Sequence, residues 1–327
     1  MEIIRYEWKY IFDEANKKNP FTIIPKELYE APETLSKFYA LTDHSLEALL
    51  DGYVYATHPA EFNDLFDCNE KLIEYDDDQM ITAFLNPALP REEIKQLLRE
   101  KRAELHNDIQ LMFRDIIYRK WGVCSMTSNG NNLLMWSYYT KNEGFLIEFD
   151  YKTFPFKFHG PFPVNYQNKI IPVTVSECGG LGIPLLYQAT IKHDRWEHEN
   201  EWRILIDAEK DVLYSPEPEM LRYMGGRERK FHYPPSVVKS IALGNRFFQN
   251  EEMKPLDKYS LRIDLKKKIE MKSLLLDFLS HNKIKTHIAI RHNDLSSLKF
   301  TIGNIEKIDD KTFQYQITTQ ESLMKRP

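Results

Sequence analysis

Apolar residues recur at helical spacing in two stretches of the chain. Between positions 3 and 17 they lie three or four residues apart, and the Asn19-Pro20 step that follows is unfavourable for continuing a helix. From Pro90 to Trp121 the same spacing is sustained for longer, with Pro90 suited to a first helical turn and Gly122 to a stop. The pattern therefore predicts an N-terminal amphipathic helical extension and one long amphipathic helix.

Shorter patterns predict further strands and helices. Runs of β-branched and aromatic residues bounded by Gly, Pro, Asn or Asp are typical of strands. The predicted strands are a short one after Ser36 and those at 53–56, 123–126, 144–149, 201–206, 238–244, 287–291, 299–303 and 313–317. The predicted helices are 46–50, 132–139, 184–189 and 271–279. The passage 151–164 is predicted to be irregular or to form edge strands, because each proline removes a ladder donor.

Together these elements predict an α+β fold with a mixed or split antiparallel sheet core and flanking helices. We expect a helical extension over residues 1–33, a single α+β domain over 34–305, and a C-terminal strand and tail over 306–327. No internal repeat divides the chain, which favours one mixed domain. The apolar face of the N-terminal helix is expected to dock on the body of the fold, and a homo-oligomer formed through it is the alternative.

Composition and charge narrow the class of protein. With 42% apolar and 28% charged residues the chain resembles an ordinary globular protein, and its formal net charge of −5 gives no general attraction to nucleic acid or anionic membranes. Three cysteines without metal-ligand spacing predict reduced thiols and a cytoplasmic location. We read no signal peptide at the N-terminus and no run of about eighteen apolar residues, so we expect no membrane partner.

Two glutamates are the first candidates for chemistry. Glu199 and Glu201 are two residues apart, so in a strand their carboxylates would lie side by side on one face. Two neighbouring acids repel, and that cost is usually offset by a cation, a metal, or a task that needs a raised carboxyl pKa. The alternative is a solvated edge strand in which Arg195 and Arg203 are surface partners of the acids.

A run of hydroxyl residues and an acidic loop are the next candidates. Ser125 and Thr127 alternate at the end of a predicted strand, ahead of a turn, where their hydroxyls would stand at a rim and position a ligand. The alternative is that polar residues here, Ser128 or Asn131, cap the helix that carries Trp136. No Gly-x-Ser-x-Gly elbow accompanies them, so a hydrolase triad is not supported.

The segment Glu61 to Asp67 contains three acids and an amide among aromatic residues. Asn63 and Asp64 in it could bind a metal or a ribose, or could simply bond their own backbone in a turn. The run 227–235 is basic and aromatic, so it could contact a phosphate backbone, with an ordinary solvated loop as the alternative.

Several of these segments resemble a bacterial family known as domain of unknown function 2971. The resemblance covers roughly residues 36–305 and is carried by Phe38-Tyr39, SLEALLDG, AEFNDLFD, LLMWSYYTKNEGFLIEFD, Lys192, Trp196, Glu199, Glu201-Trp202-Arg203 and VVKSIALGNRF. The family has no settled activity, so this resemblance does not identify a reaction. Its scattered occurrence among bacteria implies a role in defence or as a toxin.

A second similarity is to the ADP-ribosyltransferase superfamily, whose members bind NAD in a split antiparallel sheet. The superfamily has an early strand with an aromatic or His residue, a Ser-Thr-Ser type strand end, and a late strand with Gln-x-Glu or Glu-x-Glu. Ser125-Met126-Thr127 is similar to the second element and Glu199-Asn200-Glu201 to the third. One departure is Ala40-Leu41-Thr42, which stands where many relatives have His-Tyr-Thr, and it removes the group expected to hold the adenosine ribose.

This similarity implies roles for individual residues. Glu201 would bind the nicotinamide ribose hydroxyl and stabilise an oxocarbenium-like transition state, while Glu199 would orient or deprotonate the acceptor, a protein or a nucleic acid. The residues expected to contact NAD are Tyr39, Asn63, Ser125, Thr127, Trp136 and Arg203, with the ring of Tyr39 or Trp136 against the nicotinamide.

Two other functions remain open from the residues alone. A metal-dependent nuclease or phosphoesterase would use Asp64, Glu199 and Glu201 as ligands, because oxygen donors suit Mg²⁺ and Mn²⁺. A non-catalytic sensor or partner-binding module would use the Glu-Trp-Arg strand only structurally. Every catalytic interpretation requires the acidic pair, the hydroxyl rim and aromatic walls to meet around one pocket.

Overall fold

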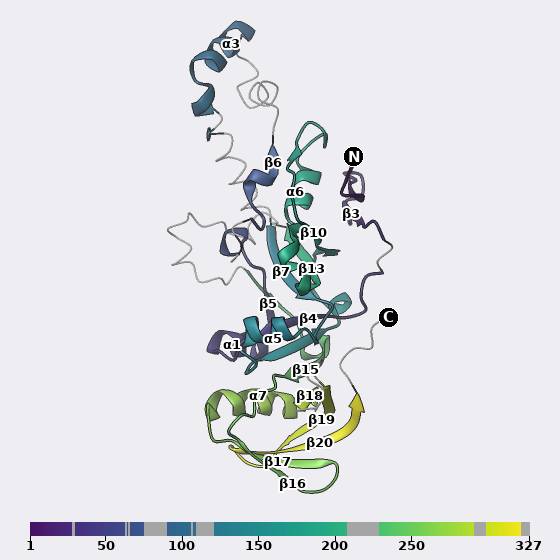
Figure 1. The fold of residues 1–327 in the computed structure, drawn as a ribbon, viewed down its shortest axis with the longest axis vertical. Coiled ribbons are helices and arrows are strands. Elements are labelled where there is room, and N and C mark those ends of the chain that lie inside the picture. Colours follow the sequence, from purple (N-terminus) through teal and green to yellow (C-terminus); the bar gives the residue numbers. More distant parts are fainter. Residues whose placement is uncertain are drawn as a thin grey trace.

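The structure is a computed structural model that describes residues 1–27, 30–62, 64, 66–74, 90–105, 107–108, 121–207, 229–290 and 299–321. Its largest element is an eleven-stranded sheet (Figure 1). The strand order is β16 (Glu252–Pro255), β17 (Ser260–Asp264), β20 (Thr312–Glu321), β19 (Lys299–Lys307), β18 (Lys285–Ile290), β15 (Val238–Leu243), β8 (Phe145–Phe149), β4 (Leu35–Tyr39), β7 (Trp121–Thr127), β13 (Glu201–Asp207) and β9 (His159–Pro163). Neighbouring strands are antiparallel except for the parallel pair β15 and β18, so the predicted α+β class with a mixed sheet is confirmed.

Smaller sheets and helices surround the large sheet. The additional strands are β1 (Glu2–Arg5), β2 (Trp8–Phe12) and β3 (Phe21–Ile24) in one sheet, and the pairs β10 (Asn165–Gln167) with β12 (Ile191–His193), β11 (Val173–Thr174) with β6 (Ile73–Glu74), and β14 (Lys230–His232) with β5 (Tyr53–Tyr55). The α-helices are α1 (Asp43–Leu50), α3 (Arg91–Glu100), α5 (Leu133–Thr140), α6 (Gly182–Gln188) and α7 (Ile269–His281). Short 3₁₀ turns are η1 (Pro59–Glu61), η2 (Glu70–Leu72), η3 (Tyr151–Thr153), η4 (Asp194–Glu199) and η7 (Pro235–Val237). Among the described helices, none has the length and apolar character needed to cross a membrane.

The N-terminal segment is a three-stranded sheet, so the predicted helical extension is wrong. Tyr6 and Glu7 both have positive φ angles, 51° and 66°, and form a two-residue turn that pairs β1 with β2. Apolar residues three or four positions apart fit an amphipathic helix, but they also fit the two strands of such a hairpin. The turn at Tyr6 and Glu7 selects the hairpin. The alternative of an oligomer formed through an N-terminal helix lacks that helix among the described residues, because residues 2–24 form the strands β1–β3 and the connections between them. Tyr10 of β2 instead packs against Tyr187 of α6, with ring centroids 5.4 Å apart, so this segment docks on the body of the fold.

The long helix predicted over 90–121 is observed in part. α3 begins after Pro90, helical turns continue at 102–105 and 107–108, and residues 109–120 lie outside the described part of the chain. Gly122 lies inside β7 and does not end the helix, because Gly122 pairs with Ile206 in the ladder to β13. The predicted helices that became α1, α5, α6 and α7 are confirmed.

Part of the basic run 227–235 forms a strand, where a solvated loop was the alternative to a phosphate contact. Residues 230–232 form β14, which pairs with β5, and residues 227–228 are outside the described residues. Arg229 is buried and donates a hydrogen bond to the Ala56 carbonyl 3.0 Å away. Burial of this arginine makes it part of the fold, so it offers no surface for a phosphate backbone.

Both edges of the large sheet are protected against pairing with another chain. β9 carries Pro161 and Pro163, which lack a backbone N–H, and β16 combines Glu252 and Lys254 with a terminal Pro255. The prediction of an edge strand within 151–164 is confirmed by β9.

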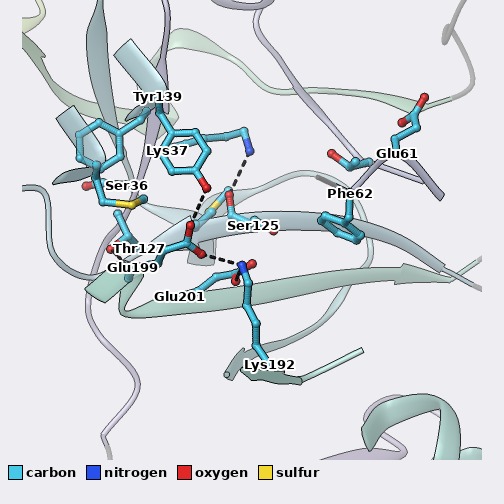
Figure 2. A pocket seen from close by; sticks show the side chains of 14 residues that line it. Ser36, Lys37, Glu61, Phe62, Ser125, Thr127, Tyr139, Lys192, Glu199 and Glu201 are labelled. Carbon is cyan, nitrogen blue, oxygen red and sulfur yellow. Dashed lines mark hydrogen bonds and ion pairs between the residues drawn. The ribbon is translucent and has the colours of Figure 1, made fainter. Parts of the chain in front are cut away.

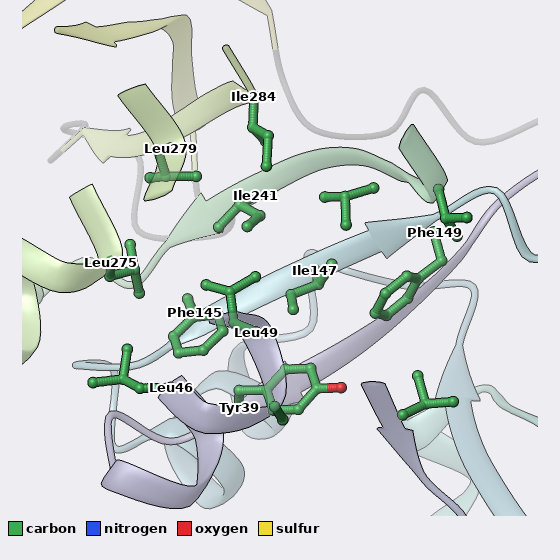
Figure 3. Close-up of a cluster of buried hydrophobic side chains, with 14 of the residues drawn as sticks. Tyr39, Leu46, Leu49, Phe145, Ile147, Phe149, Ile241, Leu275, Leu279 and Ile284 are labelled. Carbon is green, nitrogen blue, oxygen red and sulfur yellow. The ribbon is translucent and has the colours of Figure 1, made fainter. Parts of the chain in front are cut away.

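β7 and β13 separate two hydrophobic cores. Side chains alternate along each strand, so Cys124 and Ile204 point into one core while Val123 and Leu205 point into the other. The larger core lies between the large sheet and the helices α1 and α7 (Figure 3). The smaller core packs β1–β3 and α6 against the opposite face. Because both faces of β13 are covered, a charged side chain on this strand is removed from solvent.

His287 on β18 is expected to make stability depend on pH. Its side chain is buried, and among the described residues neither ring nitrogen has a hydrogen-bond partner. Burial, assisted by the charge of Lys285, lowers the pKa of His287 to about 4, against about 6.5 in an unfolded chain. A histidine with a lowered pKa favours folding above pH ~6.5, and this contribution is lost as the pH falls towards ~4.

We therefore expect His287→Leu to abolish an acid-induced loss of stability. Between pH ~6.5 and ~4 the wild-type protein should lose about 2–3 kcal/mol more than the variant in free energy of unfolding. Urea unfolding at a series of pH values measures this difference. His44→Gln is the control, because the His44 side chain is almost fully exposed and should leave the pH dependence unchanged. Parallel pH curves for the wild type and His287→Leu would contradict the assignment.

Candidate functional site

The strands β4, β7 and β13 lie side by side and align one polar residue from each. Ser36 pairs with Thr127, and Thr127 pairs with Glu201, so the three side chains share one face of the sheet. β4 pairs with β7 at this one residue pair but pairs with β8 over five, so β4 and β7 diverge beyond Ser36. The sheet is therefore split next to the polar row.

A pocket of about 370 Å³ opens at this split (Figure 2). Its lining side chains come from β4, β7, β12, β13, α5 and the turns η1 and η4 with their flanking residues. They are Ser36, Lys37, Phe38, Thr57, Glu61, Phe62, Ser125, Met126, Thr127, Met135, Tyr139, Lys192, Glu199 and Glu201. The acidic pair, the hydroxyl residues and aromatic walls thus meet around one pocket, which every catalytic interpretation requires.

Arg203 is the centre of a buried charge cluster on the floor of this pocket. We define the cluster as Asp67, Lys192, Glu199, Glu201 and Arg203, all of them 5% exposed or less. Arg203 donates to both carboxylate oxygens of Asp67, at 2.7 and 2.6 Å, and to both oxygens of Glu201, at 2.8 and 3.0 Å. Such bidentate pairing satisfies a buried guanidinium and fixes the orientation of both carboxylates.

The Lys192 ammonium lies between all three carboxylates. Its Nζ is 2.7 Å from Glu199, 3.1 Å from Glu201 and 3.5 Å from Asp67. Burial lowers the pKa of Lys192, but attraction to the carboxylates, led by Glu201, outweighs it and leaves the pKa above its ordinary value. Lys192 is therefore a permanent cation at neutral pH, and it occupies the point that the three acids surround.

Glu201 is ionised in spite of its burial. Burial raises the pKa of Glu201, but the positive charges of Arg203 and Lys192 outweigh it and hold the pKa well below the ordinary range. Burial together with the charge of Glu199 raises the pKa of Tyr139, so this side chain remains a phenol. The pocket therefore presents carboxylate anions next to a phenolic donor.

We predicted that Glu199 and Glu201 lie on one regular strand, and this prediction is wrong. Glu199 ends the turn η4, Asn200 adopts a left-handed conformation with φ of 43°, and Glu201 begins β13. Their carboxylates still meet, because both contact Lys192. The alternative of a solvated edge strand with Arg203 as a surface partner is wrong, because β9 and the smaller core cover β13 and leave Arg203 0% exposed.

The hydroxyl of Thr127 and the helix α5 hold Glu199 in place. Thr127 Oγ1 donates to the Glu199 carbonyl at 2.7 Å, and Tyr139 of α5 donates from its hydroxyl to Glu199 Oε1 at 2.5 Å. Asn132 caps α5 and also donates to the His198 carbonyl, which ties the start of the helix to η4. Helix capping by Ser128 or Asn131 was the alternative that we considered for this region. Asn132 is the residue that caps the helix.

Tyr39 and Trp136 lie in the core and do not line the pocket. The ring of Tyr39 stacks on Phe145 with centroids 5.4 Å apart, and both are drawn among the core side chains of Figure 3. Trp136 is fully buried and donates from Nε1 to the Gly130 carbonyl at 2.9 Å. Phe38 lines the pocket instead, with the Trp136 ring edge-on behind it.

The loop after β5 contributes a residue that the sequence prediction missed. Asn63 lies outside the described residues, and Asp64 accepts a hydrogen bond from the Phe66 N–H at 3.0 Å, in the turn considered as an alternative. Asp67 supplies the carboxylate to Arg203, 136 residues further along the chain. A local sequence pattern cannot predict a contact between residues so far apart in the chain. The contact between Lys192 and Asp67 could not be predicted for the same reason.

The charge cluster does not fit a Mg²⁺ or Mn²⁺ site. Three oxygen-donor residues converge, but the Lys192 ammonium stands where the cation would have to bind. Asp64, the third ligand of the predicted metal site, does not line the pocket. Across the described ranges no group of three His, Cys, Asp or Glu side chains is arranged to hold a metal ion.

Comparison with protein-family models, with curated proteins and with solved structures gives no match to this chain. The two family resemblances of the sequence therefore stay predictions. The chemistry that this pocket can support has to be inferred from its own side chains.

Proposed function

We propose that the pocket is the active site of an NAD-consuming enzyme of the ADP-ribosyltransferase type, with Glu199 and Glu201 as its catalytic residues. The observation that carries the proposal is the order β4-β7-β13, because it aligns Ser36, Thr127 and Glu201 beside a pocket at a split in the sheet. These are the three strands that the resemblance to ADP-ribosyltransferases selects. This shared row of polar residues from three distant segments supports the proposal.

The electrostatics of the pocket suit a reaction that develops positive charge. Cleavage of the bond between the ribose C1 and the nicotinamide nitrogen sends the bonding electron pair to nicotinamide and leaves cationic character on the ribose. The cluster contains three carboxylates against the two cations Lys192 and Arg203, so it carries an excess of negative charge next to the pocket. Preorganised charge of this kind stabilises the transition state more than the ground state.

Glu201 retains the capacity to accept a ribose hydroxyl. A carboxylate has about four acceptor positions, and Arg203 and Lys192 use three of those on Glu201. Arg203 and Lys192 also prevent rotation of the carboxylate, which favours one orientation of the ribose. Glu199, fixed by Tyr139 and Lys192, is the second carboxylate available to orient or deprotonate an acceptor.

The pocket walls fit a flat ring and a ribose. Phe38, Phe62 and Tyr139 line the pocket, and its volume of about 370 Å³ is in the range of small-molecule sites. The walls thus replace Tyr39 and Trp136 in the role of ring contacts for nicotinamide. Consumption of NAD would deplete the pool of a bacterial cell, in agreement with a role in defence or as a toxin.

Glu199→Gln is the variant that tests the proposed function. We expect the purified full chain to release nicotinamide from NAD, and the variant to lower kcat by about 100-fold or more, because without the Glu199 charge two carboxylates face two cations and the cluster loses the excess negative charge that stabilises the developing ribose cation. Nicotinamide release measured by chromatography gives both kcat and KM. Glu199 is preferable to Glu201 for this purpose, because loss of the Glu201 charge would leave Arg203 underpaired.

The matched control is Glu251→Gln. Glu251 forms a buried ion pair with Lys272 outside the pocket, so the substitution removes a buried carboxylate without touching the site. It should reduce stability and leave nicotinamide release unchanged. Absence of nicotinamide release by the wild type, or equal rates for Glu199→Gln and wild type, would overturn the proposed function.

A further inference from the structure

Two lysines line the same pocket in opposite surroundings. Lys192 is enclosed by three carboxylates. Lys37 of β4 donates from Nζ to the Ser125 carbonyl at 3.0 Å, as Figure 2 shows. Within the part of the chain that the structure describes, Lys37 forms no ion pair. The two amines therefore differ in their electrostatic partners while they share one pocket.

A half-buried ammonium that lacks a carboxylate partner loses hydration without compensation, which favours the neutral amine. Burial lowers the pKa of Lys37, and attraction to Cys124 and Glu201 opposes this only in part. A neutral amine still donates one N–H to the Ser125 carbonyl, so the observed hydrogen bond does not require the charge. Its lone pair is then available for reaction, as in lysines that act as nucleophiles.

We propose that Lys37 is an amine nucleophile whose ligands are aldehydes. The Nζ lone pair forms a bond to the carbonyl carbon while the C–O π bond breaks, and the oxygen takes up a proton to give a carbinolamine. Loss of the second N–H proton and of the hydroxyl as water then forms the C=N bond. The step needs no oxidant or reductant, and it joins one amine and one aldehyde with release of one water.

The class of aldehyde follows from the chemistry of the site, and this assignment rests on the proposed function. Transfer of the ribosyl group to water releases a ribose with a free C1, which is in equilibrium with an open-chain aldehyde. Cleavage would thus produce a carbonyl carbon in the pocket that Lys37 lines. ADP-ribose is then the ligand expected to bond with Lys37.

Reductive alkylation tests the amine directly. The full chain is treated with propanal and cyanoborohydride at pH 7, and each lysine is quantified by peptide mass mapping. We expect Lys37 to react roughly tenfold faster or more than the exposed Lys258, because reactivity follows the neutral fraction of the amine. Lys192 is the internal control, since its carboxylate partners keep it an ammonium and it should stay unmodified.

Separate outcomes decide the two parts of the proposal. Labelling of Lys37 at the rate of Lys258, or equal labelling of Lys192, would overturn the nucleophile. Lys37→Arg, which keeps a cation at this position, should abolish the adduct. Treatment with ADP-ribose and cyanoborohydride should add one ADP-ribose mass at Lys37, and labelling by propanal alone would overturn the ligand assignment. Labelled Lys37 in a protein that releases no nicotinamide would reject the proposed function and leave the nucleophile in place.

Discussion

Replacement of Arg203 by methionine is expected to lower the free energy of unfolding by about 3–5 kcal/mol. Arg203 is fully buried and pairs with Asp67 and Glu201 through four hydrogen bonds shorter than or equal to 3.0 Å. Methionine fills a similar volume but leaves both carboxylates in the interior with only Lys192 to compensate them. Equilibrium unfolding in urea, monitored by circular dichroism, measures the change.

Arg262→Met is the matched control for this substitution. Arg262 pairs with Asp264 two residues away, but its side chain is 43% exposed. Exposed pairs contribute roughly 0–1 kcal/mol, so the control should unfold close to the wild type. Similar losses for Arg203→Met and Arg262→Met would show that the charge cluster does not carry the stability we assign to it.

Lys192→Met is expected to remove both activity and stability, with a stability loss that depends on pH. Without the ammonium, Asp67, Glu199 and Glu201 share only Arg203, so the positive charge that now depresses the pKa of Glu201 is halved. Protonation relieves the repulsion among the carboxylates. The stability deficit of the variant should therefore be about 3–5 kcal/mol at neutral pH and shrink as the pH falls below ~5.

In the wild type, the stabilising contribution of the Lys192 ammonium is lost at high pH, whereas the stability deficit of Lys192→Met shrinks at low pH. Its pKa is raised by folding, so its stabilising contribution is complete below the pKa of an unfolded lysine, ~10.4, and is lost only at higher pH. Urea unfolding at pH 5 and pH 7, together with nicotinamide release, measures both effects. We expect release to fall by about 100-fold or more, because Glu199 and Glu201 lose their common anchor.

Lys272→Met is the control for Lys192→Met. Lys272 forms a buried ion pair with Glu251 outside the pocket, so its loss should cost stability without reducing nicotinamide release. A deficit in Lys192→Met that is independent of pH would contradict the view that one ammonium compensates three carboxylates. Full activity in that variant would contradict its role in positioning Glu199.

Prediction from sequence succeeded where local pattern and structure depend on the same residues. The strands at 201–206 and 238–244 and the helices at 132–139 and 271–279 were identified by period and by flanking turn residues, which act locally. It failed at positions 3–17, where the same apolar spacing fits a helix and a hairpin. There the left-handed turn at Tyr6 and Glu7 selects the hairpin.

The residues of the candidate site also divide into those that the sequence predicted correctly and those that it did not. Glu199, Glu201, Ser125 and Thr127 line the pocket as the sequence led us to expect, whereas Tyr39 and Trp136 were named for their ring type alone. An aromatic ring suits a core and a ligand pocket equally, and the packing of neighbouring elements decides which it joins. Thr127 lines the pocket, but its hydroxyl holds the Glu199 backbone.

The sequence by itself determined the class of the fold, the position of β13 and the presence of an acidic pair beside a hydroxyl-bearing strand end. Tertiary structure alone decided that Asp67 and Lys192 join the pair, that Arg203 is buried, and that Lys37 has no carboxylate partner among the residues the structure describes. The physical reason is that periodicity and turn chemistry act over a few residues. Burial and ion pairing depend on groups brought together from across the chain, and no local pattern records those partners.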